Sequence, residues 1–193
     1  MMLISGLFSI VVIGVLFANM LHYIDDVNAA DQAVKICRIN VNTSARNIRE
    51  MALNNDTSAY DSYEQNVKKL LTEVDSQLEI LKKTKVLPDE EYNEYASALS
   101  DWGNIGYSII EEIKNGEKEK AIDEIFNSCT PALNKLVEIA IRLDEITDEV
   151  SEQSARTTII FAVAGMVCII ICLVCACTCL LYTSPSPRDY AAS

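Results

Sequence analysis

The sequence predicts an all-α protein, an up-down-up-down four-helix bundle flanked by two transmembrane helices. Two long apolar segments without Asp, Glu, Lys or Arg lie near the two ends of the 193-residue chain. Between them, apolar residues recur at alternating steps of three and four, the spacing of helices that bury one face. With only 6 Gly and 4 Pro, the chain also lacks the turn residues that an all-β fold needs.

The two apolar segments divide the chain. Residues 1–24 and 157–178 contain no Asp, Glu, Lys or Arg, and about 20 apolar residues are enough to cross a bilayer. A cleaved signal peptide is the alternative for 1–24, but that segment has no basic n-region and no clear A-x-A site. We therefore predict two retained spans, with residues 25–156 as the domain between them and residues 179–193 as a tail.

The charge balance limits the kinds of function. The chain has 28 acidic and 16 basic residues and a net charge of −12, which excludes a typical nucleic-acid binder. Its one histidine, His22, leaves no Ser-His-Asp triad in water and no multi-histidine metal site. All charged residues except Arg188 and Asp189 lie in 25–156. We expect this acidic domain to lie outside the cytoplasm, with the protein in the cell membrane.

The C-terminal tail is expected to be non-native. Residues 179–189 read CLLYTSPSPRD, which resembles the translation of a sequencing adapter. The alternative is a genuine juxtamembrane turn in which Pro185 and Pro187 end the helix. On the adapter interpretation, the natural protein continues beyond Thr178 into an output module, and a short basic segment is expected before Met1.

Four helices are predicted within the middle domain, near residues 27–54, 57–86, 89–115 and 117–156. Polar or helix-breaking residues separate them: Asn54 to Thr57, Leu87-Pro88, and Asn115-Gly116. These connections are only a few residues long, which makes successive helices antiparallel neighbours. The first and fourth helices show no break before their spans, so each is expected to continue through the membrane.

Several residues have both a structural and a functional interpretation. Pro131 in the fourth helix predicts a kink. In the functional interpretation, the polar groups freed at this kink contribute to a ligand site. Cys37 and Cys129 fall about 22 and 42 Å from their spans by helical rise. They are expected to be core thiols, although pairing of Cys37 between subunits stays open. Tyr92, Tyr95 and Trp102 are expected in the core.

No arrangement of residues predicts an enzyme, a metal site or a cofactor. The adjacent carboxylates Glu90-Glu91 and Glu111-Glu112 point to different faces of a helix and do not form acid–base pairs. The sequence has no glycine-rich phosphate loop and no nucleophile with an evident base. We therefore predict a binding or signalling protein.

Four segments carry a resemblance to a known family. They are LISGLFSIVVIGVL in the first span, NTSARNIREMAL and ALSDWGNIGYSI in the first and third bundle helices, and EKAIDEIF at the start of the fourth. With the order span, bundle, span, residues 3–178 resemble the four-helix-bundle sensory module of bacterial methyl-accepting chemotaxis proteins. The resemblance implies a homodimeric receptor that binds a small molecule or periplasmic protein and signals through its second span. The sensory module of a histidine kinase or cyclase, and a structural membrane adaptor, are the alternatives.

The candidate ligand site lies on the first bundle helix. At about 100° per residue, Arg38 and Arg49 share one face and Arg46 lies on the adjacent side. Arginine grips carboxylates in a bidentate fork, and related receptors use arginines of this helix in the same way. We expect a small anion near these arginines, with Asn42 and Thr130 as further contacts. The alternative is that the arginines only neutralise neighbouring acids.

Overall fold

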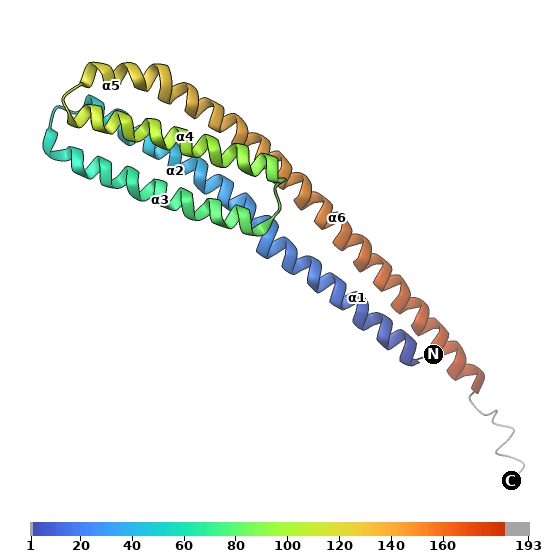
Figure 1. Ribbon diagram of the computed structural model, residues 1–193. Coiled ribbons are helices and arrows are strands. Elements are labelled where there is room, and N and C mark those ends of the chain that lie inside the picture. Colours follow the sequence, from blue (N-terminus) through green and yellow to red (C-terminus); the bar gives the residue numbers. More distant parts are fainter. Residues whose placement is uncertain (1, 184–193) are drawn as a thin grey trace, which may run out of the picture. The chain divides into compact units, whose positions relative to one another are not determined.

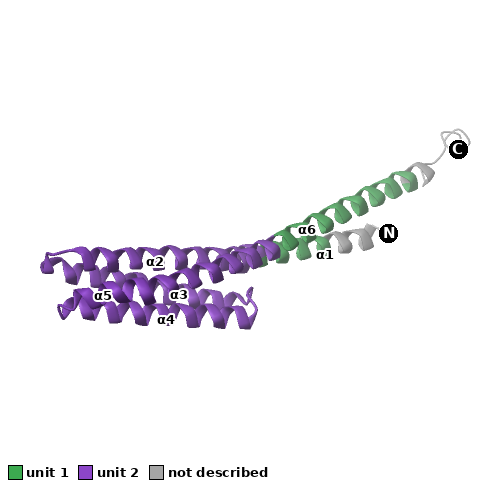
Figure 2. Cartoon of the chain, turned by 90° about the horizontal axis from the view of Figure 1, so that it is seen from above, with its two compact units in different colours: residues 1–22, 152–193 green, residues 23–151 purple. Residues whose placement is uncertain are grey.

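The computed structural model describes residues 2–183 of the chain. Within this range the chain is helical apart from short connections, and no strand occurs. The chain divides into two compact units, coloured separately in Figure 2. Unit 1 comprises residues 1–22 and 152–193, and unit 2 comprises residues 23–151. The predicted all-α class is confirmed.

The elements are labelled along the chain in Figure 1. The α-helices are α1 (Met2–His22), α2 (Asn28–Leu53), α3 (Tyr60–Thr84), α4 (Asp89–Lys114), α5 (Lys118–Glu124) and α6 (Thr130–Thr183). Two π-helical segments, η1 (Tyr23–Val27) and η3 (Ile125–Cys129), and a 3₁₀ turn, η2 (Thr57–Ala59), lie between them. The four predicted bundle helices correspond to α2, to η2 with α3, to α4, and to α5 with η3 and the first part of α6.

The predicted breaks have the expected local chemistry. Asp56 Oδ1 accepts a hydrogen bond from the Ser58 amide at 3.0 Å, which satisfies a free donor at the start of η2. Pro88 stands directly before α4, where its missing N–H is not needed. Gly116 follows the end of α4 with φ +86°, a conformation that glycine adopts without strain.

The core of unit 2 is an apolar seam between its helices. Trp102, Tyr95, Ile48 and Met51 are the largest side chains that are fully buried there. A Cβ atom at Gly106 would lie 3.1 Å from Cδ1 of Ile48, so α4 and α2 approach closely at this glycine. Tyr95 and Trp102 are therefore core residues, as predicted.

Ion pairs across helices identify the neighbours in the bundle. Arg38 of α2 pairs with Asp144 of α6 at 2.8 Å, and Arg142 of α6 pairs with Glu91 of α4 at 2.8 Å. Lys114 of α4 lies 2.5 Å from Glu64 of α3. Since α2 and α3 also pack against each other, each helix of the bundle lies beside two others. This is the predicted up-down-up-down arrangement.

Unit 1 contains the two apolar segments. The helical stretches Ile10–Leu53 and Lys118–Cys179 each contain a window long and apolar enough to cross a membrane, and 6% of each window is buried. A Cβ at Gly165 would lie 2.7 Å from Cγ1 of Val12. The missing side chain thus lets α1 and α6 approach each other closely, as small residues do between membrane helices.

Both long helices contain a π-helical irregularity. η1 joins α1 to α2 without a break, which agrees with the predicted continuous first helix. η3 precedes Thr130 and Pro131. Proline lacks an amide donor and clashes with the preceding turn, and a wider turn is one way a helix accommodates such a disturbance. Of the predicted non-native tail, 179–183 lie in α6, and 184–193 lie outside the described residues.

Two isoleucines of different burial should contribute differently to the stability of the bundle. Ile48 is 0% exposed and Ile80 is 37% exposed. Replacing Ile48 by Ala should lower the free energy of unfolding by about 2–5 kcal/mol, because it leaves a cavity in the core. Replacing Ile80 by Ala should cost less than about 1 kcal/mol. Fluorescence of the single tryptophan, Trp102, reports the thermal midpoint of the bundle in detergent. An equal decrease in the thermal midpoint for the two variants would contradict this assignment of the core.

Candidate functional site

Arg38 is held within the bundle by an ion pair. Its Nη1 donates to Oδ2 of Asp144 at 2.8 Å, and its side chain is 34% exposed. Asn42 donates from Nδ2 to the Arg38 carbonyl oxygen at 2.8 Å. Two predicted site residues, Arg38 and Asn42, are therefore in contact through the Arg38 carbonyl oxygen. The Arg38 guanidinium itself is paired with a carboxylate of α6.

Arg49 and Thr130, far apart in the sequence, are in contact. Arg49 Nη2 donates to Thr130 Oγ1 at 3.3 Å. The same hydroxyl donates to the Ile125 carbonyl oxygen at 2.7 Å, at the start of η3. Thr130 thus links α2 to the irregular turn that precedes α6. No ion pair of Arg49 occurs within the side chains described for 10–179, so its charge is not offset by a direct carboxylate partner.

Arg46 is the most exposed of the three arginines. Its side chain is 71% exposed, and its Nε lies 3.5 Å from Oε1 of Glu50 on the same helix. Arg46 and Arg49 are three residues apart and are therefore neighbours on the helix surface. Arg38 lies eleven residues before Arg49, about 16 Å along the axis. One small anion cannot contact both Arg38 and Arg49, so only Arg46 and Arg49 form a compact pair.

The space beside Arg38 is small. Arg38 and Asn42 line a crevice of about 10 Å³ together with Tyr95 and residues of α6. Such a volume holds at most one water molecule. The crevice beside Arg38 is therefore too small for an organic anion, whereas the side chain of Arg46 is 71% exposed to solvent.

The buried thiols have the properties of core residues. Cys37 is fully buried and its Sγ donates to the Val74 carbonyl oxygen at 3.8 Å. Burial raises the pKa of Cys37 to about 12, and burial also raises the pKa of Cys129. A thiol must ionise to act as a nucleophile, so both residues are protonated at neutral pH and are unsuited to catalysis.

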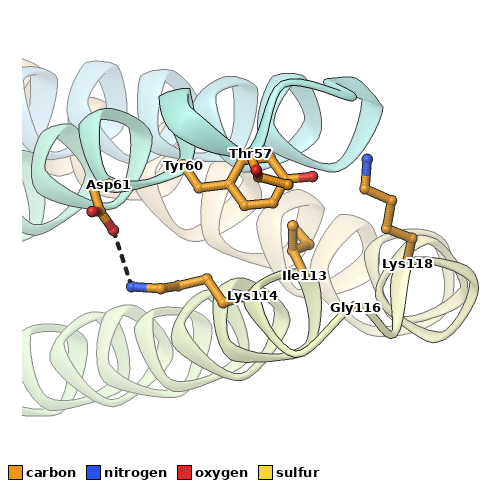
Figure 3. A pocket seen from close by; sticks show the side chains of 7 residues that line it. All are labelled: Thr57, Tyr60, Asp61, Ile113, Lys114, Gly116 and Lys118. Carbon is orange, nitrogen blue, oxygen red and sulfur yellow. Dashed lines mark hydrogen bonds and ion pairs between the residues drawn. The ribbon is translucent and has the colours of Figure 1, made fainter.

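A pocket that the sequence analysis did not identify lies where the α2–α3 and α4–α5 connections meet (Figure 3). We call it the loop-end pocket. It has a volume of about 420 Å³ and is lined by Thr57, Tyr60, Asp61, Ile113, Lys114, Gly116 and Lys118. The two predicted breaks, at 54–57 and 115–116, were a signal for it, because antiparallel helices bring these connections to the same end.

A second polar cluster lies near this end, between α4 and α5. Glu112 is buried, and its Oε1 lies 2.8 Å from Nζ of Lys120. Partial burial raises the pKa of Glu124, and a hydrogen bond with Glu112 and the negative charge of that residue add to the effect. The charge of Lys120 acts in the opposite direction. Glu112 and Glu117, at 2.8 and 3.4 Å, are the ion-pair partners of Lys120, and Glu124 lies beside Glu112 without such a partner among the described side chains.

Comparison with protein families identifies the class. The model of a four-helix-bundle sensory module for signal transduction matches residues 1–174. The chain belongs to this family of sensory modules, which occurs in chemotaxis receptors. No curated protein and no solved structure matches the chain. The family is a signalling module and not a catalytic domain, and it belongs to chemoreceptors, which typically act as dimers and sense ligands.

The carboxyl cluster predicts a dependence of stability on pH. A carboxyl pKa raised in the folded state means that ionisation disfavours folding, so the penalty is present above the folded pKa and disappears below the unfolded pKa. Glu124→Gln removes this penalty. It should raise the unfolding midpoint at pH 7.5, and the gain should vanish near pH 4. Trp102 fluorescence during heating measures the unfolding midpoint at each pH. Glu119→Gln, on the exposed side of α5, is the control. A gain that grew as the pH fell would contradict the argument.

Proposed function

We propose that the chain is the ligand-sensing and membrane-crossing part of a transmembrane chemoreceptor. Residues 25–156 form a sensory bundle outside the cytoplasm, and residues 1–24 and 157–178 span the membrane. Residues 179–193 form a non-native tail. The single observation that carries the proposal is the match of the chemoreceptor sensory family to residues 1–174.

The proposed route of the signal is α6. Residues 130–151 of this helix belong to the bundle, where Thr130 and Asp144 contact arginines of α2. The same helix continues to Thr183 and contains the more apolar of the two candidate spans. A continuous helix passes a small displacement along its axis, and packed interfaces turn such shifts into discrete states. Ligand contacts that favour one position of α6 would thereby change the output.

We infer that the receptor is a homodimer formed through the outer face of α2. Exposed residues on this helix repeat at steps of three and four: Gln32, Lys35, Ile39, Asn42, Arg46, Glu50 and Leu53. Ile39 is 61% exposed and Leu53 is 75% exposed, although both are apolar and stand two heptads apart. A second copy of α2 would cover them in a coiled-coil contact. The polar Asn42 between them would set the register.

The proposed ligand is a small anion at Arg46 and Arg49, with Asn42 and Thr130 as neighbouring polar residues and Arg38 as a more remote charge. Among the described side chains, Arg49 contacts only the Thr130 hydroxyl, at 3.3 Å, and Arg46 is mostly exposed. Both guanidinium groups therefore keep donors for a carboxylate. Since Arg46 lies on the outer face of α2, a homodimer would bring both copies of this site to the subunit interface.

The dimer is testable by disulfide crosslinking. Ile39→Cys is placed in a full-length background in which the five cysteines from Cys168 to Cys179 are replaced by serine. Mild oxidation should convert most of the protein to a covalent dimer, because residues at the centre of a coiled-coil seam face their copies. Ser76→Cys on the exposed side of α3 is the control and should crosslink at least about tenfold more slowly. Equal rates would contradict a dimer through α2.

Receptor function is testable in a chimera. Residues 1–178 are joined to the cytoplasmic part of a chemoreceptor with known kinase coupling, and kinase activity is measured against a panel of amino and organic acids. At least one anion should change kinase activity. Arg49→Ala should raise the half-effective concentration about tenfold or more, since a charge-assisted hydrogen bond is lost. Lys69→Ala, which removes an exposed cation of α3, should leave the response unchanged.

Two outcomes would contradict the proposal. If no compound changes kinase activity in a chimera that assembles and activates the kinase, the chain is not the sensor of such a receptor for small anions. If a compound acts equally well on the wild type and on Arg49→Ala, the chain is a sensor but the arginines only stabilise the bundle.

A further inference from the structure

The loop-end pocket combines an apolar floor with a charged rim. Tyr60 and Ile113, which are 6% and 1% exposed, pack in the interior, and Figure 3 shows both between Lys114 on one side of the pocket and Lys118 on the other. Nothing lies within 4 Å of a Cβ built on Gly116, so the wall beside the turn is open. Its volume of about 420 Å³ lies in the range of pockets that hold small molecules.

Lys114 contributes little net attraction for an anion. Its Nζ lies 2.5 Å from Oε2 of Glu64 and 3.3 Å from Oδ1 of Asp61, and Figure 3 shows the link to Asp61 along the rim. Two carboxylates therefore offset its charge. Lys114 serves mainly to hold α3 against α4 at the edge of the pocket.

Lys118 is the cation that remains available. Its Nζ donates to the Asn54 carbonyl oxygen, lies 3.4 Å from Asn55 Oδ1, and stands 5.6 Å from the centre of the Tyr60 ring. All three partners are neutral, and Lys118 forms no ion pair within residues 10–179. An ammonium group whose neighbours are only neutral still attracts an anion strongly.

We propose that the loop-end pocket binds a small organic monocarboxylate with an apolar body. The carboxylate contacts Lys118, and the apolar body lies against Tyr60 and Ile113. This site is separate from the arginines of α2 and does not depend on their binding an anion. It also does not depend on the receptor assignment, because it rests only on the contacts within unit 2.

The pocket is placed to affect the helices that frame it. Lys118 is the first residue of α5 and contacts the carbonyl oxygen of Asn54, the residue directly after α2. The Tyr60 hydroxyl donates to the same oxygen at 3.0 Å. A carboxylate that draws the Lys118 ammonium toward itself would weaken this bond between α2 and α5. Occupancy would thus change how the two connections are tied together.

The test uses the full chain in detergent with phenylacetate as the probe. Phenylacetamide, of the same shape without charge, is the matched neutral compound. Lysine acetylation is followed residue by residue by mass spectrometry. Saturating phenylacetate should slow acetylation of Lys118 at least about fivefold, because an amine held by a carboxylate is shielded. Lys83 on α3 is exposed and should react at an unchanged rate, and phenylacetamide should protect neither residue.

Variants then locate the contact. By calorimetry, Lys118→Gln should weaken phenylacetate binding about tenfold or more, whereas Lys118→Arg should retain it within about threefold. Trp102 fluorescence confirms that each variant is folded. Arg49→Ala should leave the protection of Lys118 intact.

Three results would overturn the proposal. The first is equal or absent protection at Lys118 and Lys83. The second is unchanged affinity in a folded Lys118→Gln variant. The third is loss of Lys118 protection in Arg49→Ala, which would place the anion on α2 instead. None of these results contradicts the receptor assignment, which the chimera tests separately.

Discussion

Burial of the apolar seam of α2 fixes the rotation of this helix about its axis, and the positions of its polar residues follow. Ala30, Val34, Cys37, Val41 and Ile48 face the interior with almost no exposed surface. With 3.6 residues per turn, Arg38 and Arg49 must then flank the seam, where they reach α6, and Arg46 must face outward. A rotation of α2 by one residue would expose the seam and separate Arg49 from Thr130.

The same constraint gives α2 two separate faces. Its inner face packs against α3, α4 and α6, while its outer face leaves Ile39 and Leu53 in solvent. An apolar residue on the outer face buries no surface within one chain, and this exposure is what supports the proposed contact with a second copy.

The loop end of the bundle combines irregular backbone with polar contacts. Cross-helix ion pairs surround the apolar core, and exposed pairs of this kind contribute about 0–1 kcal/mol each. At the loop end, carbonyl oxygens at the end of α2 lack helical partners and draw in Lys118 and the Tyr60 hydroxyl. The π-helical turn η3 is held by the Thr130 hydroxyl in a comparable way. Irregular backbone and polar contacts therefore occur together.

The sequence by itself determined the helical class, the apolar segments, the breaks and the core stripe, because each follows from local spacing or from a residue with restricted backbone geometry. Gly116, Pro88 and the Tyr95–Trp102 stripe lie where this reasoning placed them. It also placed Arg38, Arg46 and Arg49 on one helix. Only the tertiary structure decided which distant residues these long side chains contact. Arg38 contacts Asp144, Arg49 contacts Thr130, and Lys118 contacts Asn54. Such partners lie 64–106 residues apart, and which long side chains meet depends on how packing rotates and aligns the helices that carry them.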